Sequence, residues 1–238
     1  MKYALLLLLA ATGCIDPIDA RWQLDHDHVI AARATPPRIR AGDATNLDAL
    51  VAHANAPVSI ENPMTAEVAT RGFEPYLEQR HDGAWSLESP SAEVLTAARP
   101  ALSLADDEPV PVDVMLTFPH PMGLDRAALD PYRVKKTVWL GEPRANPELP
   151  AITIDGQPAP AETDTIALPL DRDVYIAVDA PDDTRVNWLT NVGTLFQDDV
   201  AKAYVHVTAK DRLDGQLVVV MRDAEGGVAW RVWSVLAR

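Results

Sequence analysis

The chain has 238 residues, of which 47% are hydrophobic, and a formal net charge of −14 at pH 7. An acidic protein of this kind repels nucleic acid backbones, so we expect no nucleic acid among its partners. Its single cysteine, Cys14, excludes a disulfide framework, and the fold must therefore depend on a packed hydrophobic core.

The first residues have the pattern of an export signal. Lys2 provides a positive charge, residues 5–9 are all leucine, and small residues at positions 11–13 stand directly before Cys14. An apolar run of about eight residues is too short to span a bilayer as a helix, which needs about 20. It does have the length of the hydrophobic region of a secretory signal, so we predict that residues 1–13 are a signal peptide.

The sequence Ala11-Thr12-Gly13-Cys14 resembles a bacterial lipobox, although Ala11 stands where leucine is usual. The resemblance implies that the mature chain begins at Cys14, that this residue is lipidated, and that its acyl chains anchor the protein to the bilayer. Ile15 follows the cysteine instead of an aspartate, which in this family favours the outer membrane of the cell envelope. The alternative is a plain signal peptide cut nearby, with Cys14 incidental.

The distribution of proline along the chain favours β-structure over long helices. Twenty prolines are spread along the sequence, and proline is tolerated at strand edges and turns but not in helix interiors. After a tether at residues 14–23, we predict a β-sandwich-like domain at residues 24–143, with a short helix from Ser89-Pro90 to Ala98. Its expected strands are residues 28–34, 44–52, 84–88, 110–118 and 134–140.

Residues 110–118 form the clearest predicted strand. Valine, leucine and phenylalanine occupy every second position there, which is the pattern of a strand with one buried face. In the strand that follows, Lys136 falls in the same row as Val138 and Leu140.

Residues 144–238 are predicted to form a second domain of seven to eight short strands. These strands are residues 152–154, 165–168, 174–178, 186–189, 195–196, 204–208, 217–221 and 228–235. The last two are expected to pair as a hairpin, because Gly226 and Gly227 between them supply the positive φ that a tight turn demands. This number and spacing of strands is typical of one β-sandwich.

Trp188 lies in one of these strands, where an immunoglobulin-type domain keeps its central tryptophan, so the C-terminal third resembles an immunoglobulin-like module. The cysteine pair that brackets this tryptophan in the family is absent. The resemblance implies the fold class, which is all-β with two immunoglobulin-like β-sandwich domains after an N-terminal lipoprotein signal peptide.

Two kinds of side-chain cluster have the chemistry of metal ligands. In a strand, His26 and His28 of the sequence Asp25-His26-Asp27-His28 would point to one face, but zinc needs three or four ligands and no further ligand is apparent nearby. Calcium ligands are often loop carboxylates, but aspartate also favours turns by bonding its own backbone. Such acidic loops are residues 171–173, 179–183 and 211–214. We predict no metal site and no cofactor.

The sequence contains no recognised catalytic motif, such as a G-x-S-x-G elbow, an H-E-x-x-H helix or a phosphate-binding glycine loop. We therefore predict no catalytic residue and no enzyme activity. Trp230 and Trp233 lie on opposite faces of the last strand. One of them either faces solvent, as in a sugar- or protein-binding patch, or is covered by the other domain.

These observations predict a bacterial envelope lipoprotein that serves as a non-enzymatic structural, adhesion or interaction module. Its expected partners are the lipid bilayer, through acylated Cys14, and an envelope protein or polysaccharide. Two alternatives remain open. A carbohydrate-binding module would expose two or more aromatic rings in one plane, and a lipoprotein hydrolase would place paired carboxylates in a concave site.

Overall fold

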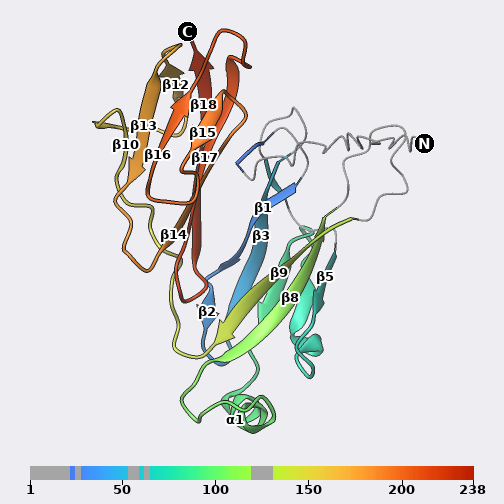
Figure 1. Ribbon diagram of the computed structural model, residues 1–238. Helices are drawn as coiled ribbons and strands as arrows, with labels where there is room; N and C mark the ends of the chain where they lie inside the picture. Colours follow the sequence, from blue (N-terminus) through green and yellow to red (C-terminus); the bar gives the residue numbers. More distant parts are fainter. Residues whose placement is uncertain (1–21, 25–27, 53–58, 62–64, 119–130) are drawn as a thin grey trace, which may run out of the picture.

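A computed structural model describes residues 22–24, 28–52, 59–61, 65–118 and 131–238, and β-strands dominate it (Figure 1). The strands of the N-terminal half are β1 (His28–Thr35), β2 (Arg38–Ile39), β3 (Ala44–Ala52), β4 (Ser59–Glu61), β5 (Thr65–Val68), β6 (Leu77–Gln79), β7 (Trp85–Glu88), β8 (Val110–Phe118) and β9 (Tyr132–Leu140). Those of the C-terminal half are β10 (Ile152–Ile154), β11 (Gln157–Pro158), β12 (Thr165–Leu168), β13 (Asp173–Val178), β14 (Arg185–Thr190), β15 (Thr194–Phe196), β16 (Lys202–His206), β17 (Asp214–Arg222) and β18 (Val228–Ala237).

One α-helix, α1 (Ala92–Ala101), and a 3₁₀ turn at Glu74–Tyr76 complete the regular structure of the described residues. The helix begins after Ser91 and so lies slightly later in the chain than predicted. Within the described ranges, no helix has both the length and the apolar character needed to cross a bilayer.

The N-terminal half folds into two sheets with a hydrophobic core between them. One sheet has the order β1-β3-β7-β6, with β4 beside β3, and the other has the order β2-β9-β8-β5. The side chains at every second position of β8, from Val110 to Phe118, point into this core and are at most 1% exposed. The strand predicted at residues 110–118 is therefore confirmed, and its period-2 pattern is the reason that it forms there.

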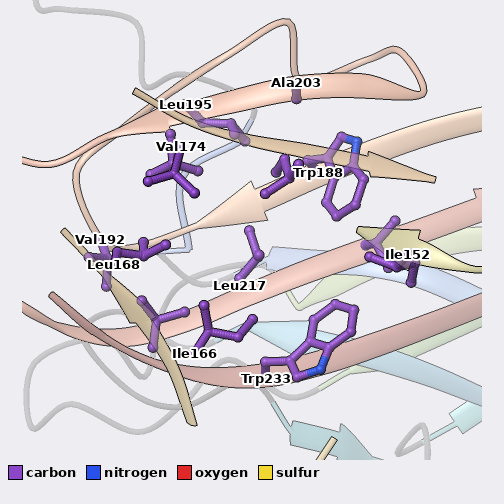
Figure 2. Packing of buried hydrophobic residues seen from close by; sticks show 14 of the residues in the cluster. Ile152, Ile166, Leu168, Val174, Trp188, Val192, Leu195, Ala203, Leu217 and Trp233 are labelled. Carbon is purple, nitrogen blue, oxygen red and sulfur yellow. The ribbon is translucent and has the colours of Figure 1, made fainter. Parts of the chain in front are cut away.

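The C-terminal half repeats this arrangement with the sheets β11-β10-β13-β16-β15 and β12-β18-β17-β14. Trp188 and Trp233 are fully buried between the two sheets, where Figure 2 shows their rings among aliphatic side chains. Their indole N–H groups donate to the carbonyls of Val200 and Pro160, at 3.1 Å in each case. Both rings thus contribute a large apolar surface to the core without leaving a donor unsatisfied.

The two halves share one strand order, which assigns the fold. In chain order, β1, β3, β5, β6, β7, β8 and β9 correspond to β10, β13, β14, β15, β16, β17 and β18. Each half pairs its first, second, fifth and fourth strands in one sheet and its third, sixth and seventh in the other, as immunoglobulin constant-type domains do. Each also adds a short strand parallel to the last one, β2 on β9 and β12 on β18. The predicted all-β fold with immunoglobulin-like sandwiches is confirmed.

A third hydrophobic cluster joins the two sandwiches, and we call it the seam. It consists of Ile30, Ala31, Leu50 and Ala52 on one side, Leu189, Val218, Val220 and Val228 on the other, and Leu24, whose backbone N–H donates to the carbonyl of Thr190 on β14. The first group lies mainly on β1 and β3, and the second on β14, β17 and β18. In Figure 1 the tip of the β17–β18 hairpin reaches the N-terminal sandwich beside β1 and β2.

Polar contacts from the connecting segment reinforce the seam. The amide of Asn146 donates to the carbonyl of Ala34 at 2.8 Å and accepts from the backbone N–H of Val228 at 2.8 Å, so one side chain holds both sandwiches. Arg144 forms an ion pair of 2.8 Å with Glu225. The domain boundary predicted between residues 143 and 144 falls between the two cores and stays a prediction.

Candidate functional site

The residues predicted as the lipidation site and the histidine cluster fall largely outside the described ranges. Cys14 lies there, as do residues 25–27. His28 is described, begins β1, and lines a 510 Å³ cavity at the seam together with Trp22 and Arg222.

Carboxylates in two of the acidic loops of the C-terminal sandwich form hydrogen bonds with other groups of the protein. The Asp173 carboxylate contacts Nδ1 of His206 at 2.8 Å, and Asp211 accepts from the backbone N–H and the hydroxyl of Thr208 at 2.7 and 2.8 Å. The hydrogen bonds from Thr208 hold the pKa of Asp211 below its usual value. Across the described residues, no group of three or more acidic, histidine or cysteine side chains could hold a metal ion.

Trp230 lies at the seam, as the domain-packing alternative predicts. It packs partly buried against the seam cluster, and the Arg33 guanidinium lies 3.8 Å from its ring centre. The same guanidinium pairs with Asp48 at 2.6 Å, which fixes it over the ring. Trp233 is in the C-terminal core, so neither side chain of this pair forms an exposed patch.

A different aromatic group is exposed on the outer face of the C-terminal sandwich. Tyr175 on β13, Tyr204 on β16 and Phe196 on β15 lie side by side, because Tyr204 is the register partner of both other residues. Tyr175 is 62% exposed and Phe196 40%, and they are the two exposed aromatic side chains among the described residues. We call these three residues the aromatic ridge.

The ridge is a stack of rings. The rings of Phe196 and Tyr204 are 9° from parallel with centres 4.7 Å apart, and the Tyr175 ring is tilted by 46° at 5.8 Å. Two rings lying side by side in one plane cannot approach to 4.7 Å without overlap, so these rings stand face to face. The ridge therefore does not form the row of coplanar rings that the carbohydrate-binding alternative requires.

Polar residues flank the ridge on the same face of the sheet. The next row of register partners toward one side is Asp173, His206 and Thr194. On the other side, Lys202 pairs in register with Ala177. An apolar centre with a polar border is the usual anatomy of a protein-binding surface.

The ridge faces away from the seam, because the two features belong to different sheets of the C-terminal sandwich. The seam uses the outer face of β12-β18-β17-β14, whereas the ridge stands on β13, β16 and β15. Sequence reasoning missed the ridge, although one signal was present. Tyr175 lies between Val174 and Ile176, both of which point inward, so an outward tyrosine follows from the alternation.

Comparisons with known proteins add no family assignment. No protein-family model matches the chain, and a search of curated proteins also finds no match. Among solved structures, the chain is similar to the N-terminal Ig1-2 module of the Drosophila receptor protein tyrosine phosphatase DLAR. The two are 11% identical with a TM-score of 0.29, over 90% of this chain and 99% of that one.

Murine CEACAM1b is 11% identical with a TM-score of 0.29, over 89% of this chain and all of the other (100%). A nucleoside hydrolase-related hypothetical protein from Saccharophagus degradans is 14% identical with a TM-score of 0.31. That match covers 40% of this chain and 26% of the other protein. Likenesses this weak carry no inference about function, and the fold assignment rests on the strand order.

Proposed function

We propose that the protein is a lipid-anchored, non-enzymatic interaction module of the bacterial envelope, and that it binds a protein partner through the aromatic ridge. The single observation that supports the ridge as the contact surface is the exposure of Tyr175 and Phe196 on one sheet face. Large aromatic side chains are normally buried, and tyrosine is enriched among the residues that dominate binding energy at interfaces.

The shape of the ridge favours a protein partner over a polysaccharide. Stacked rings project edges and one outer ring face, which suit insertion between the side chains of a partner. A flat sugar ring would instead need coplanar faces. The net charge of −14 further favours a partner with a basic surface around the contact, since complementary charge accelerates association.

The anchor in this proposal rests on the lipobox at positions 11–14. Two or more acyl chains on Cys14 would give stable attachment to the outer membrane. The expected result is that Cys14→Ser moves the protein from the membrane fraction to the soluble fraction, and that mass spectrometry finds acyl chains on the wild-type residue. Unmodified Cys14 in the membrane fraction would contradict the anchor without affecting the ridge.

The ridge is tested by co-sedimentation of a non-lipidated chain with envelope fragments of the bacterium that produces it. We expect the double variant Tyr175→Ala with Phe196→Ala to bind about tenfold more weakly or worse, because truncating an interface anchor typically costs about 1.4 kcal/mol or more. Val94→Ala is the matched control, since Val94 is a 41% exposed apolar residue on α1.

Treatment of the envelope fragments identifies the class of partner. Prior proteolysis should abolish binding of the wild-type chain, whereas periodate oxidation of glycans should leave it unchanged. Loss of binding after periodate alone would favour the carbohydrate-binding alternative. Equal binding of the double variant and the wild type would refute the ridge as the contact surface.

A further inference from the structure

A second cavity, separate from the aromatic ridge, lies at the seam between the two sandwiches. Its volume is about 290 Å³, and its lining includes Lys136 and Thr137 from β9 together with Arg222 and Asp223 at the end of β17. Pockets between domains are common ligand sites, and this volume accommodates a small ion or group. The N-terminal sandwich thus contributes a buried cation, Lys136, and the C-terminal sandwich a partly buried one, Arg222, to the same cavity.

Lys136 is an unusual residue for such a buried position. It is 6% exposed, and its ammonium donates one hydrogen bond, to the carbonyl of Gly226 across the seam. An ammonium has three donors, so this contact engages one of the three. Burial lowers the pKa of Lys136 to about 8, an effect that the like charge of Arg222 reinforces and that Asp223 and Asp48 oppose.

Arg222 is similarly placed. Its guanidinium donates to the side-chain oxygen of Asn187 at 2.7 Å and to the carbonyl of Ile30 at 2.8 Å. Both acceptors are neutral, and these bonds engage two of the five donors of the guanidinium. Burial and the nearby Arg185 lower its pKa, which is the direction expected where positive charge is not fully compensated.

Two carboxylates, Asp223 and Asp48, act on Lys136, and both also bond other groups of the protein. Oδ1 of Asp223 accepts from the backbone N–H groups of Glu225 and Gly227, at 2.9 and 2.7 Å, and so closes the hairpin turn. Asp48 pairs with Arg33. Lys135, which also lines the cavity, pairs with Asp113 at 2.9 Å. The cavity therefore holds two cations, Lys136 and Arg222, against the single unpaired carboxylate of Asp223, in a chain with a net charge of −14.

We propose that the Lys136–Arg222 cavity binds a small anionic group, a carboxylate or a tetrahedral oxyanion, which bridges the two sandwiches. The group would take the free donors of both cations as charge-assisted hydrogen bonds. Because one cation belongs to each sandwich, a bound anion would also tighten the seam. Ligand binding at the seam would then stabilise the whole fold.

The test measures thermal unfolding of the non-lipidated chain in sulfate, whose charge is constant between pH 6 and pH 10, against chloride at equal ionic strength. At tenfold its dissociation constant, sulfate should raise Tm by roughly 3–6 °C at pH 7. Lys136→Met should lose this shift, and Lys210→Met, a change of an exposed lysine that does not line the cavity, should keep it. Acetate in place of sulfate tells whether the site prefers a carboxylate.

A measurement on the wild type covers the case in which Lys136→Met does not fold. Its sulfate shift should fall between pH 7 and pH 9.5 as Lys136 loses its proton. Sulfate also stabilises proteins in general through exclusion from their surface. An equal shift in the wild type and Lys136→Met, or a shift that is unchanged at pH 9.5, would mean that only this general effect operates and would overturn the proposal.

Discussion

At the scale of single residues, Lys136 shows how surroundings change the chemistry of a side chain. The alternation of β9 places it in the row of Val138 and Leu140, and the structure buries it there. The tip of the β17–β18 hairpin then supplies the Gly226 carbonyl and covers the ammonium. The sequence predicts that Lys136 lies in this row, but the side chain is buried by a segment that lies 90 residues away in the chain.

The lowered pKa of Lys136 predicts an unusual dependence of stability on pH. From about pH 8 to about pH 10.5 the folded state has lost the proton while the unfolded state keeps it, so the free energy of unfolding should rise with pH in this window. The rise, relative to Lys136→Met, should be on the order of 3 kcal/mol. Urea denaturation of both proteins at pH 7.5, 9 and 10.5 measures it, and parallel curves would show that burial does not perturb Lys136.

At the scale of elements, the turns between strands set the register that forms the aromatic ridge. Gly193 lies between β14 and β15, with a φ of +68°. A Cβ at this position would lie 2.4 Å from the backbone oxygen of His206, so only glycine permits β15 to approach β16 this closely. This approach brings Phe196 against Tyr204.

Gly193→Ala should therefore be much more costly than Gly42→Ala. Gly42 also has a positive φ, of +80°, but a Cβ there would meet nothing within 4 Å. We expect the Gly42 variant to lose about 1 kcal/mol from backbone strain alone, and the Gly193 variant to lose about 2 kcal/mol more from the clash. Thermal unfolding followed by circular dichroism compares them, and equal Tm values would contradict the close approach.

At the scale of the whole molecule, the seam makes two similar sandwiches into one structure. Neighbouring residues of β17 serve different cores, because Val218 and Val220 face the seam and Val219 faces the interior of the C-terminal sandwich. The two sandwiches should accordingly unfold together.

The double variant Val218→Ala with Val220→Ala should uncouple the sandwiches. It removes about 3 kcal/mol of apolar burial from the seam, so calorimetry should show a broadened or divided unfolding transition. Val219→Ala is the matched control, and it should lower Tm while the transition stays single. A single sharp transition in the seam variant would mean that the polar contacts of Asn146 and Arg144 suffice to couple the halves.

Strands with a local pattern could be predicted from the sequence alone. Residues 44–52 and 110–118 were predicted with the bounds that the structure has, and the hairpin of β17 and β18 follows from its glycine turn. These predictions succeed because period-2 alternation and positive-φ turns depend on neighbours within a few residues.

Which outer sheet faces are covered and which are exposed depends on contacts between segments that are far apart in the chain. Leu50 lies on the outward face of β3 and is buried because the C-terminal sandwich packs on it, whereas Tyr175 lies on the outward face of β13 and stays exposed. No local pattern distinguishes the two positions. Each sheet face is apolar or polar by its own sequence, but its burial depends on which distant strands the fold brings against it.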